Sequence, residues 1–376
     1  MFSFRSFYVT AAFLCVLVFN SNLSIAQVDF TTTTIDPGAT YLLKMEDGKR
    51  YAGRIERVGS DFLLMTRRSG RQAWPDLADI KSLKKVDDKF VPKTVEQIRE
   101  GLVKEFQGKY VVSKTGHFLV VHPPGSYEKW AFPFEKFYAN FRAYWRARGV
   151  QLKEPEFPLV AVVLRTQREF QRIAKSKNLE SAGGYFSHDS NRMFTYVRDF
   201  DSVGKAQNHQ YTLYVVYHEI AHQLAFNTGL QERGTSSAQW FSEGLAQLFE
   251  AKGVNDSIKH STLKSRVHYS ELKRYLDFRE SGKAKSIVDR LMTGRELFNA
   301  NEGLAYSSAW ALMMYLAETR PQDLAKYVRL QRDKARRGSN RWSRKALFEK
   351  SFGETATVEA HMNQYMNRLA EEVGLK

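Results

Sequence analysis

Hydrophobic and polar residues alternate at short range near the N-terminus and follow a helical period over much of the remaining chain. Apolar or alternating runs bounded by turn residues predict strands over residues 41–45, 51–58 and 62–66. Asp47-Gly48 lies between the first two runs and is a typical hairpin turn signal. Trp74 and the segment 77–80 end this unit. The spacing predicts a small five-stranded β-barrel over residues 38–90.

After this unit the pattern changes to strands mixed with longer helical segments, which predicts an α+β fold. Further strands are expected over residues 110–112, 117–122, 157–164 and 192–197. Helices are expected from Thr94, over 132–149, over 166–176, over 211–226 and through most of the chain after Gln239. Residues 181–190 contain glycine and are expected to form a loop. The predicted organisation is a leader over 1–26, linkers over 27–37 and 91–94, the barrel over 38–90 and a second domain over 95–376.

The segment 218–222 has the pattern His-Glu-x-x-His and carries the clearest chemical signal. Residues four apart on a helix share one face, so His218 and His222 can bind the same metal ion. Glu219 is then held beside a metal-bound water as a general base. A catalytic zinc usually has three protein ligands, and Glu243 is the expected third. The alternative is a helix whose imidazoles are satisfied by ordinary hydrogen bonds.

The two ligand segments resemble the gluzincin zinc peptidases, the clan of thermolysin and aminopeptidase N. Trp240 and Gly244, on either side of the third ligand, strengthen the likeness. The resemblance is closer to the minigluzincins and to secreted bacterial domains of unknown function similar to them, and it extends loosely from about Val95 to the C-terminus. It implies one catalytic Zn²⁺ held by the two histidines and Glu243, with Glu219 as general base, acting on peptide bonds.

Further site residues are implied by the same resemblance. Tyr306, at the start of a Tyr-x-x-x-Trp segment ending at Trp310, would donate to the oxyanion of the reaction. The alternative is that these two residues form an aromatic pair in the core. Where thermolysin-like sites have an acidic residue that orients a histidine, this chain has Gln247. Glu250 lies on the same helix face and either supports a histidine instead or is solvated.

The resemblance also implies where a substrate would lie. In gluzincins the strand before the zinc helix is an edge strand, which corresponds to Arg192–Val197, and an extended peptide pairs with it. Arg192, Phe194 and Tyr196 are therefore expected to contact the substrate. His188, just before this strand, is a further candidate, although a lone histidine is more often structural.

The N-terminal segment has the features of a signal peptide. Arg5 precedes an apolar run over residues 7–19, which is too short to span a bilayer comfortably. Ser24 and Ala26 suit a cleavage after residue 26, and the alternative is an uncleaved anchor. Cys15 is the single cysteine, so cleavage leaves no disulfide and no cysteine ligand for zinc. We expect a secreted, periplasmic or cell-envelope protein without a transmembrane span after cleavage.

The charge balance narrows the choice of partners. The chain has 57 Lys and Arg against 41 Asp and Glu, a net charge of +16. This excess suits anionic partners, such as an envelope polymer, acidic lipids or acidic proteins, while the zinc site predicts a peptide or protein substrate. Nucleic acid fits less well, because the charge is spread along the chain and its densest run, 329–345, alternates with apolar residues.

Two further interpretations complete the sequence-based picture. The barrel resembles the SH3-like homology domain of endocytic adaptors through Asp47-Gly48-Lys49 and Leu77-x-Asp79, which implies a binding or spacer role. The preferred function is a zinc metallopeptidase. The alternatives are a zinc-containing scaffold protein of the envelope with weak catalysis, and a zinc amidase acting on a non-peptide envelope polymer.

Overall fold

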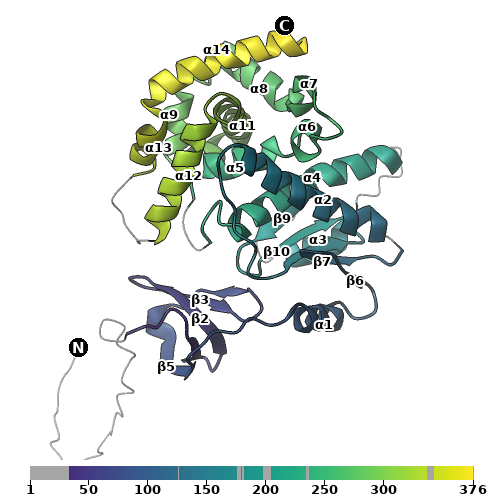
Figure 1. Ribbon diagram of the computed structural model, residues 1–376, viewed down its shortest axis with the longest axis vertical. Helices are drawn as coiled ribbons and strands as arrows, with labels where there is room; N and C mark the ends of the chain where they lie inside the picture. Colours follow the sequence, from purple (N-terminus) through teal and green to yellow (C-terminus); the bar gives the residue numbers. More distant parts are fainter. Residues whose placement is uncertain are drawn as a thin grey trace, which may run out of the picture.

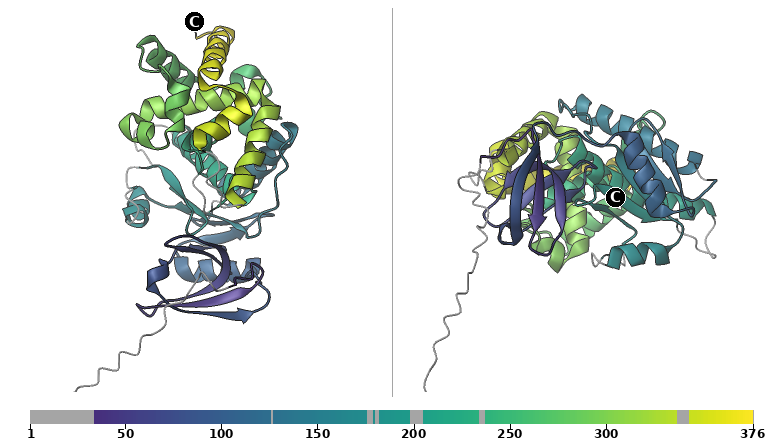
Figure 2. Two further views of the ribbon diagram at one scale, coloured as in Figure 1. Left: turned by 90° about the vertical axis from the view of Figure 1, so that its left-hand side faces the viewer. Right: turned by 90° about the horizontal axis from the view of Figure 1, so that it is seen from below.

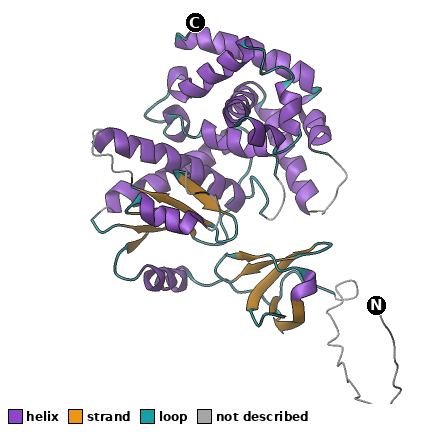
Figure 3. Cartoon of the chain, turned by 180° about the vertical axis from the view of Figure 1, so that it is seen from behind, coloured by secondary structure: helices purple, strands orange, loops and turns teal. Residues whose placement is uncertain are grey.

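The molecule consists of two five-stranded sheets and a helical region, arranged in tiers along its long axis (Figure 1). The computed structural model describes residues 34–125, 127–175, 179, 182–197, 205–233, 237–336 and 343–375. The predicted signal peptide over residues 1–26 lies outside this part of the chain. The strands form two separate groups, with most of the helices gathered beyond the second (Figures 2 and 3). The expected α+β class is confirmed.

The N-terminal sheet is antiparallel throughout, in the order β4-β3-β2-β1-β5. Its strands are β1 Thr40–Met45, β2 Arg50–Val58, β3 Leu63–Arg67, β4 Gln72–Ala73 and β5 Ile80–Asp87, with the short 3-10 helix η1 Leu77–Asp79 before β5. The predicted number of strands and the hairpin at Gly48, whose φ is +83°, are confirmed. β4 and β5 do not pair, so the described strands form an open sheet and the closed barrel is not observed.

The second sheet contains both parallel and antiparallel pairs, in the order β6-β7-β8-β10-β9. Its strands are β6 Val111–Lys114, β7 Phe118–His122, β8 Leu159–Leu164, β9 Gly184–Ser187 and β10 Arg192–Tyr196. Parallel neighbours need a crossover connection, which α2 (Tyr127–Ala147) supplies between β7 and β8. α3 (Gln167–Ala174) lies in the connection from β8 towards β10, and Thr166 caps it through the backbone N–H of Glu169.

Helices cover both faces of this second sheet, and therefore every residue of its central strand β8 is buried. One face packs against α1 (Val95–Phe106) and α3. Thr94 begins α1 with a capping box, because its side chain and that of Gln97 satisfy each other's backbone N–H groups. The opposite face packs against α2 and α4 (Lys205–Asn227).

The strand expected at the edge of this sheet lies inside it. β10 has β8 on one side and β9 on the other, so the prediction that Arg192–Val197 forms the edge strand is wrong. The edge is β9, in the segment predicted as a loop. Asn191 adopts φ +58° in the turn between the two strands, which lets the chain reverse and cover β10. A strand of four residues that begins with Gly184 and follows Gly183 has too weak a signal for β9 to be found from sequence.

α4 is anchored to the sheet by apolar residues on one face and by one buried amide. Val216, Ile220 and Leu224 are fully buried against the sheet. The side chain of Gln223 donates to the backbone carbonyls of Val160 and Asn191 at 3.1 and 2.9 Å. These contacts fix the rotation of the helix, so that His218 and His222 face away from the sheet while Glu219 reaches its edge strand β9.

The rest of the described chain is helical and packs around one buried helix, α11. The helices are α5 Gln239–Leu248, α6 Lys252–Asn255, α7 Leu263–Arg266, α8 Tyr269–Glu280, α9 Ile287–Met292, α10 Glu296–Ala300, α11 Glu302–Thr319, α12 Pro321–Arg336, α13 Arg344–Phe352 and α14 Thr355–Val373. α5 approaches α11 so closely that a Cβ on Gly244 would lie 2.4 Å from the carbonyl oxygen of Ala309. No helix in the described ranges is both long and apolar enough to cross a bilayer.

Candidate metal centre

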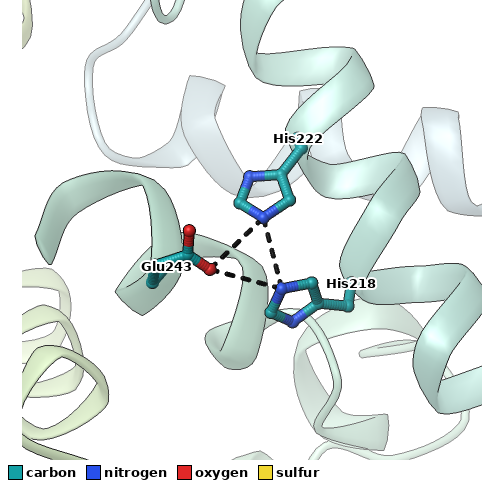
Figure 4. Close-up of side chains that lie close together, drawn as sticks. All are labelled: His218, His222 and Glu243. Atoms are coloured by element: carbon teal, nitrogen blue, oxygen red, sulfur yellow. Dashed lines mark hydrogen bonds and ion pairs between the residues drawn. The ribbon is translucent and has the colours of Figure 1, made fainter. Parts of the chain in front are cut away.

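Two histidines and one glutamate converge between α4 and α5. The Nε2 atoms of His218 and His222 are 3.2 Å apart. The Oε2 atom of Glu243 lies 3.4 Å from the first nitrogen and 3.5 Å from the second. The three ligand atoms form a nearly equilateral triangle (Figure 4). This is the one cluster of three metal-type ligands found among the residues that the structure describes.

The size of this triangle matches one face of a zinc coordination tetrahedron. With metal–ligand bonds of about 2.0–2.1 Å, the edges of a tetrahedron are about 3.3–3.4 Å long. The observed edges of 3.2, 3.4 and 3.5 Å bracket this value. Two imidazole nitrogens and one carboxylate oxygen are also a donor set that catalytic zinc sites use. The residues therefore fit a zinc ion without rearrangement.

Glu250 orients the first histidine and is shared with another. Its Oε1 atom lies 2.7 Å from Nδ1 of His218, and its Oε2 atom lies 2.8 Å from Nε2 of His268. A proton on Nδ1 of His218 leaves the Nε2 lone pair facing the other ligands. Gln247 is 5% exposed, and its Oε1 atom has no hydrogen-bond partner in the described chain. Of the two predicted supporting residues, only Glu250 contacts a ligand.

The second histidine is supported by a residue that the sequence did not single out. Nδ1 of His222 lies 3.3 Å from the hydroxyl of Ser242, which is 3.5 Å from Oε1 of Gln231. Ser242 immediately precedes Glu243 on α5, so the turn that supplies the third ligand also supplies this support. The sequence signal that could have identified Ser242 was its place next to the expected ligand Glu243.

The ligands polarise one another strongly. Burial acts to raise the pKa of Glu243, but His222 and His218 outweigh it and hold that pKa far below its usual range. Burial likewise acts to lower the pKa of His218, while Glu243 and Glu250 raise it well above 6.5. The carboxylate form of Glu243 and the protonated form of His218 therefore favour each other.

Glu219 lies in the same cleft but binds none of the ligands. Its carboxylate accepts a hydrogen bond from the backbone N–H of Phe186 in β9, and burial raises its pKa. Gly184 allows β9 to approach α4: a Cβ there would lie 2.8 Å from Val215 Cγ1 and 3.2 Å from Glu219 Cγ. The edge strand and the general-base candidate are thus in direct contact.

Tyr306 lies on the opposite wall, where α11 begins. Its hydroxyl is hydrogen-bonded to Glu243, and burial is the main reason that its pKa is raised. The ring of Phe298 packs against it edge-on with centroids 5.5 Å apart. Trp310 is fully buried, whereas Tyr306 lines the cleft. The two residues therefore have different surroundings and do not act as one core pair.

The cleft that contains these groups has a volume of about 1440 Å³ and is lined by β9, α4, α5 and the segments around α6, α7 and α10. His188, a candidate for substrate contact, lines it, and its ring packs on Phe226 with centroids 4.4 Å apart. Phe194 and Tyr196 are buried on the far face of the sheet, against α3. Arg192 pairs with Glu105 at 2.7 Å. These three residues do not line the cleft, because alternate β10 side chains point away from α4 and the strand is covered by β9.

Comparison with known proteins adds a family match over the site. Residues 212–336 match the model of a family described as a protein of unknown function, DUF1570. The matched segment includes the three ligands, Glu219 and Tyr306. No curated protein matches the chain. The family description names no activity, so the function has to be argued from the geometry of the site.

Proposed function

We propose that this chain is a zinc-dependent peptidase of the gluzincin type. The observation that carries the proposal is the triangle of ligand atoms from His218, His222 and Glu243. Its edges have the lengths expected around a tetrahedral zinc ion, and it lies beside a buried Glu219 in one large cleft. A zinc ion held there would lower the pKa of a coordinated water to about 7 and polarise a substrate carbonyl.

The protein's own groups then have distinct tasks in hydrolysis. Glu219 accepts a proton from the attacking water as the oxygen bonds to the carbonyl carbon. It later delivers that proton to the amine as the carbon–nitrogen bond breaks. Tyr306 donates its hydroxyl hydrogen to the carbonyl oxygen as negative charge develops there. Glu250 and Ser242 hold the two imidazoles in the required orientation.

The substrate chain is proposed to add to the outer edge of β9. That edge has no strand partner in the described chain. It contacts Glu219, because the backbone N–H of Phe186 in β9 donates a hydrogen bond to the Glu219 carboxylate. A peptide that pairs there by backbone hydrogen bonds would bring its scissile carbonyl to the general base. Pairing of this kind needs no particular substrate sequence, so sequence preference has to come from other parts of the cleft.

The remaining sequence-based predictions belong to the same proposal. The five antiparallel strands of the N-terminal sheet support an SH3-like binding or spacer module. The predicted leader supports a role outside the cytoplasm, in the envelope or secreted, and a mature chain without cysteine is compatible with that role.

The test uses the chain without its predicted leader, with bound metal measured before and after chelation. Wild type is expected to bind one zinc per chain and to cleave a diverse peptide library, losing activity with chelator and recovering it with zinc. Glu219→Gln should retain zinc and lose activity by about 10²–10⁴-fold, the usual contribution of a general base. Glu371→Gln, on an exposed face of α14, is the matched control and should behave as wild type.

The outcomes separate the alternatives. Zinc binding without turnover of any peptide would favour the scaffold, and turnover confined to non-peptide amides would favour the amidase. A wild-type protein that binds no zinc would overturn the site assignment altogether.

A further inference from the structure

Three cations line the cleft without any carboxylate to neutralise them. Lys252, Lys264 and Arg295 are exposed in its wall, and none makes an ion pair with a described residue. Two cations in neighbouring segments are paired: Lys136 contacts Asp256, and Arg266 contacts Glu318 at 3.0 Å. The three cations of the cleft wall have no such partner among the described residues.

The carboxylates of the cleft do not cancel this charge. Glu219 accepts the N–H of Phe186, and Glu243 and Glu250 are engaged by imidazoles. Glu302 is the one other carboxylate in the lining. Beyond the metal centre the wall thus presents three permanent cations and one anion. A concave surface of one dominant sign focuses the electric field and raises the local concentration of oppositely charged ligands.

The cations lie in two separate parts of the cleft wall, one next to Glu250 and the other next to His188. Lys252 lines the region next to Glu250, which supports His218. Lys264 follows in α7, and α6 and α7 touch where Gly253 meets Ser265. In the other part, Arg295 is close enough to His188 for their charges to interact, as is His222. A bound chain that spans both parts would meet positive charge in each.

We infer that the substrates are acidic peptide segments, with carboxylate side chains on both sides of the bond that is cut. This inference rests on the proposed peptidase function and names the substrate class of the same site. The edge of β9 recognises backbone in any sequence, whereas the three cations select for negative charge. An anionic non-peptide polymer would satisfy the charge but has no backbone for β9 to pair with.

The experiment compares matched peptide series that differ only in charge. One series has Glu and Asp around a fixed central bond, and the second replaces them with the isosteric Gln and Asn. Wild type is expected to cleave the acidic series with a kcat/KM at least about tenfold higher, in the range by which charged clefts enhance association. The ratio should shrink at high salt, because exposed charges are screened.

Charge reversal then identifies the residues responsible. Lys252→Glu, Lys264→Glu and Arg295→Glu should each reduce the acidic-to-amide ratio several-fold, and the triple variant should bring it below one. Lys104→Glu, on the exposed face of α1, is the matched control and should leave the ratio at the wild-type value. Equal cleavage of both series by wild type would overturn the inference while leaving the peptidase proposal intact.

A binding measurement keeps the two proposals separable. Fluorescence anisotropy with zinc-loaded Glu219→Gln measures peptide affinity without turnover. Preferential binding of acidic peptides would support the inference even if wild type cleaved nothing, in which case only the peptidase proposal fails. Equal binding of the acidic and amide peptides, or preference for an anionic polysaccharide over both, would overturn it.

Discussion

The two sheets of this protein have the same number of strands but differ in how they are built. In the N-terminal sheet all pairs are antiparallel, and each strand except β5 follows its neighbour along the chain. In the second sheet two pairs are parallel, so helices must cross its faces between strands. The crossings bury both faces, and the described sheet has unpaired backbone at its two edge strands, β6 and β9, of which β9 borders the cleft. A sheet made from local hairpins needs no such covering, and the first sheet carries no cluster of metal ligands in its described residues.

The comparison predicts that loss of metal affinity is confined to the second region. Glu243→Ala removes one of three ligands and should weaken zinc binding by more than about 100-fold, since removing mere supporting residues costs about 10–100-fold. Trp74→Ala in the first region should leave zinc affinity unchanged. Competition titration with a chromophoric chelator measures both. Retention of wild-type affinity by Glu243→Ala would show that the third ligand is assigned incorrectly.

Each sheet also contains a strand glycine with no room for a side chain. A Cβ on Gly184 would lie 2.9 Å from the carbonyl oxygen of Phe194, and one on Gly53 would lie 2.3 Å from that of Thr66. Gly184→Ala should displace β9 and reduce kcat/KM by about 100-fold with zinc retained, the cost expected of a misplacement of about 1 Å. Gly53→Ala should lower the free energy of unfolding by about 1–3 kcal/mol and spare turnover of the remaining folded protein. The reverse result would mean that β9 does not position substrate.

Support of the metal centre is expected to depend on one of the two predicted residues. Glu250→Gln removes the charge that holds His218 and should weaken zinc binding by about 10–100-fold. Gln247→Met is the matched control, because Gln247 is buried without contacting a ligand, and it should leave zinc affinity at the wild-type value. The same zinc titration decides the matter. Equal losses in both variants would point to general destabilisation.

One buried cation links the two regions. The guanidinium of Arg233 donates to the carbonyls of Gly70 and His188 at 3.0 and 3.1 Å, which joins the N-terminal sheet to the turn after β9. Arg233→Ala should lower the free energy of unfolding by about 1.5–3 kcal/mol, because two backbone carbonyls lose a charged donor. Lys49→Ala removes only an exposed hairpin ion pair and should produce no measurable change. Urea unfolding measures both; no loss in Arg233→Ala would mean that the regions fold without this link.

The smallest predicted effect concerns pH and His188. Burial lowers the pKa of this imidazole to about 4, below its usual 6.5. The unfolded chain therefore binds the proton first, so stability is complete above pH 6.5 and is lost as the pH falls toward 4. Because His188 is exposed to solvent, screening keeps this contribution below about 1 kcal/mol. His188→Phe, which retains an aromatic ring beside Phe226, should remove this part of the pH dependence in urea unfolding, and an unchanged profile would contradict it.

Local sequence signals predicted much of the fold and the site. The Asp47-Gly48 turn, the Thr94 and Thr166 caps and the apolar run of β8 act over a few residues, and each predicted element is present. His218, Glu219 and His222 share one helix, so their mutual placement follows from the helical period. Glu243 lies on another helix, so the helical period could not place it, and it is predicted as a ligand because a catalytic zinc needs a third one and because known sites are similar.

The predictions that failed all depended on contacts between distant segments. Strand order decides which strand is the edge, and a residue in β10 cannot show that β9 will cover it. The barrel was expected from strand count, although closure requires a β4–β5 pairing that local pattern does not encode. Ser242 and His268 join the site only because α4, α5 and the segment before α8 meet.

The sequence by itself determined most of the helices and strands and the placement of His218, Glu219 and His222 on one helix, because periodicity, capping and turn chemistry act between near neighbours. Only the tertiary structure decided that Glu250 rather than Gln247 supports a ligand, that β9 is the open edge and that three cations remain unpaired around the cleft. These features depend on packing across the chain, where buried polar groups must find partners and exposed ones need not.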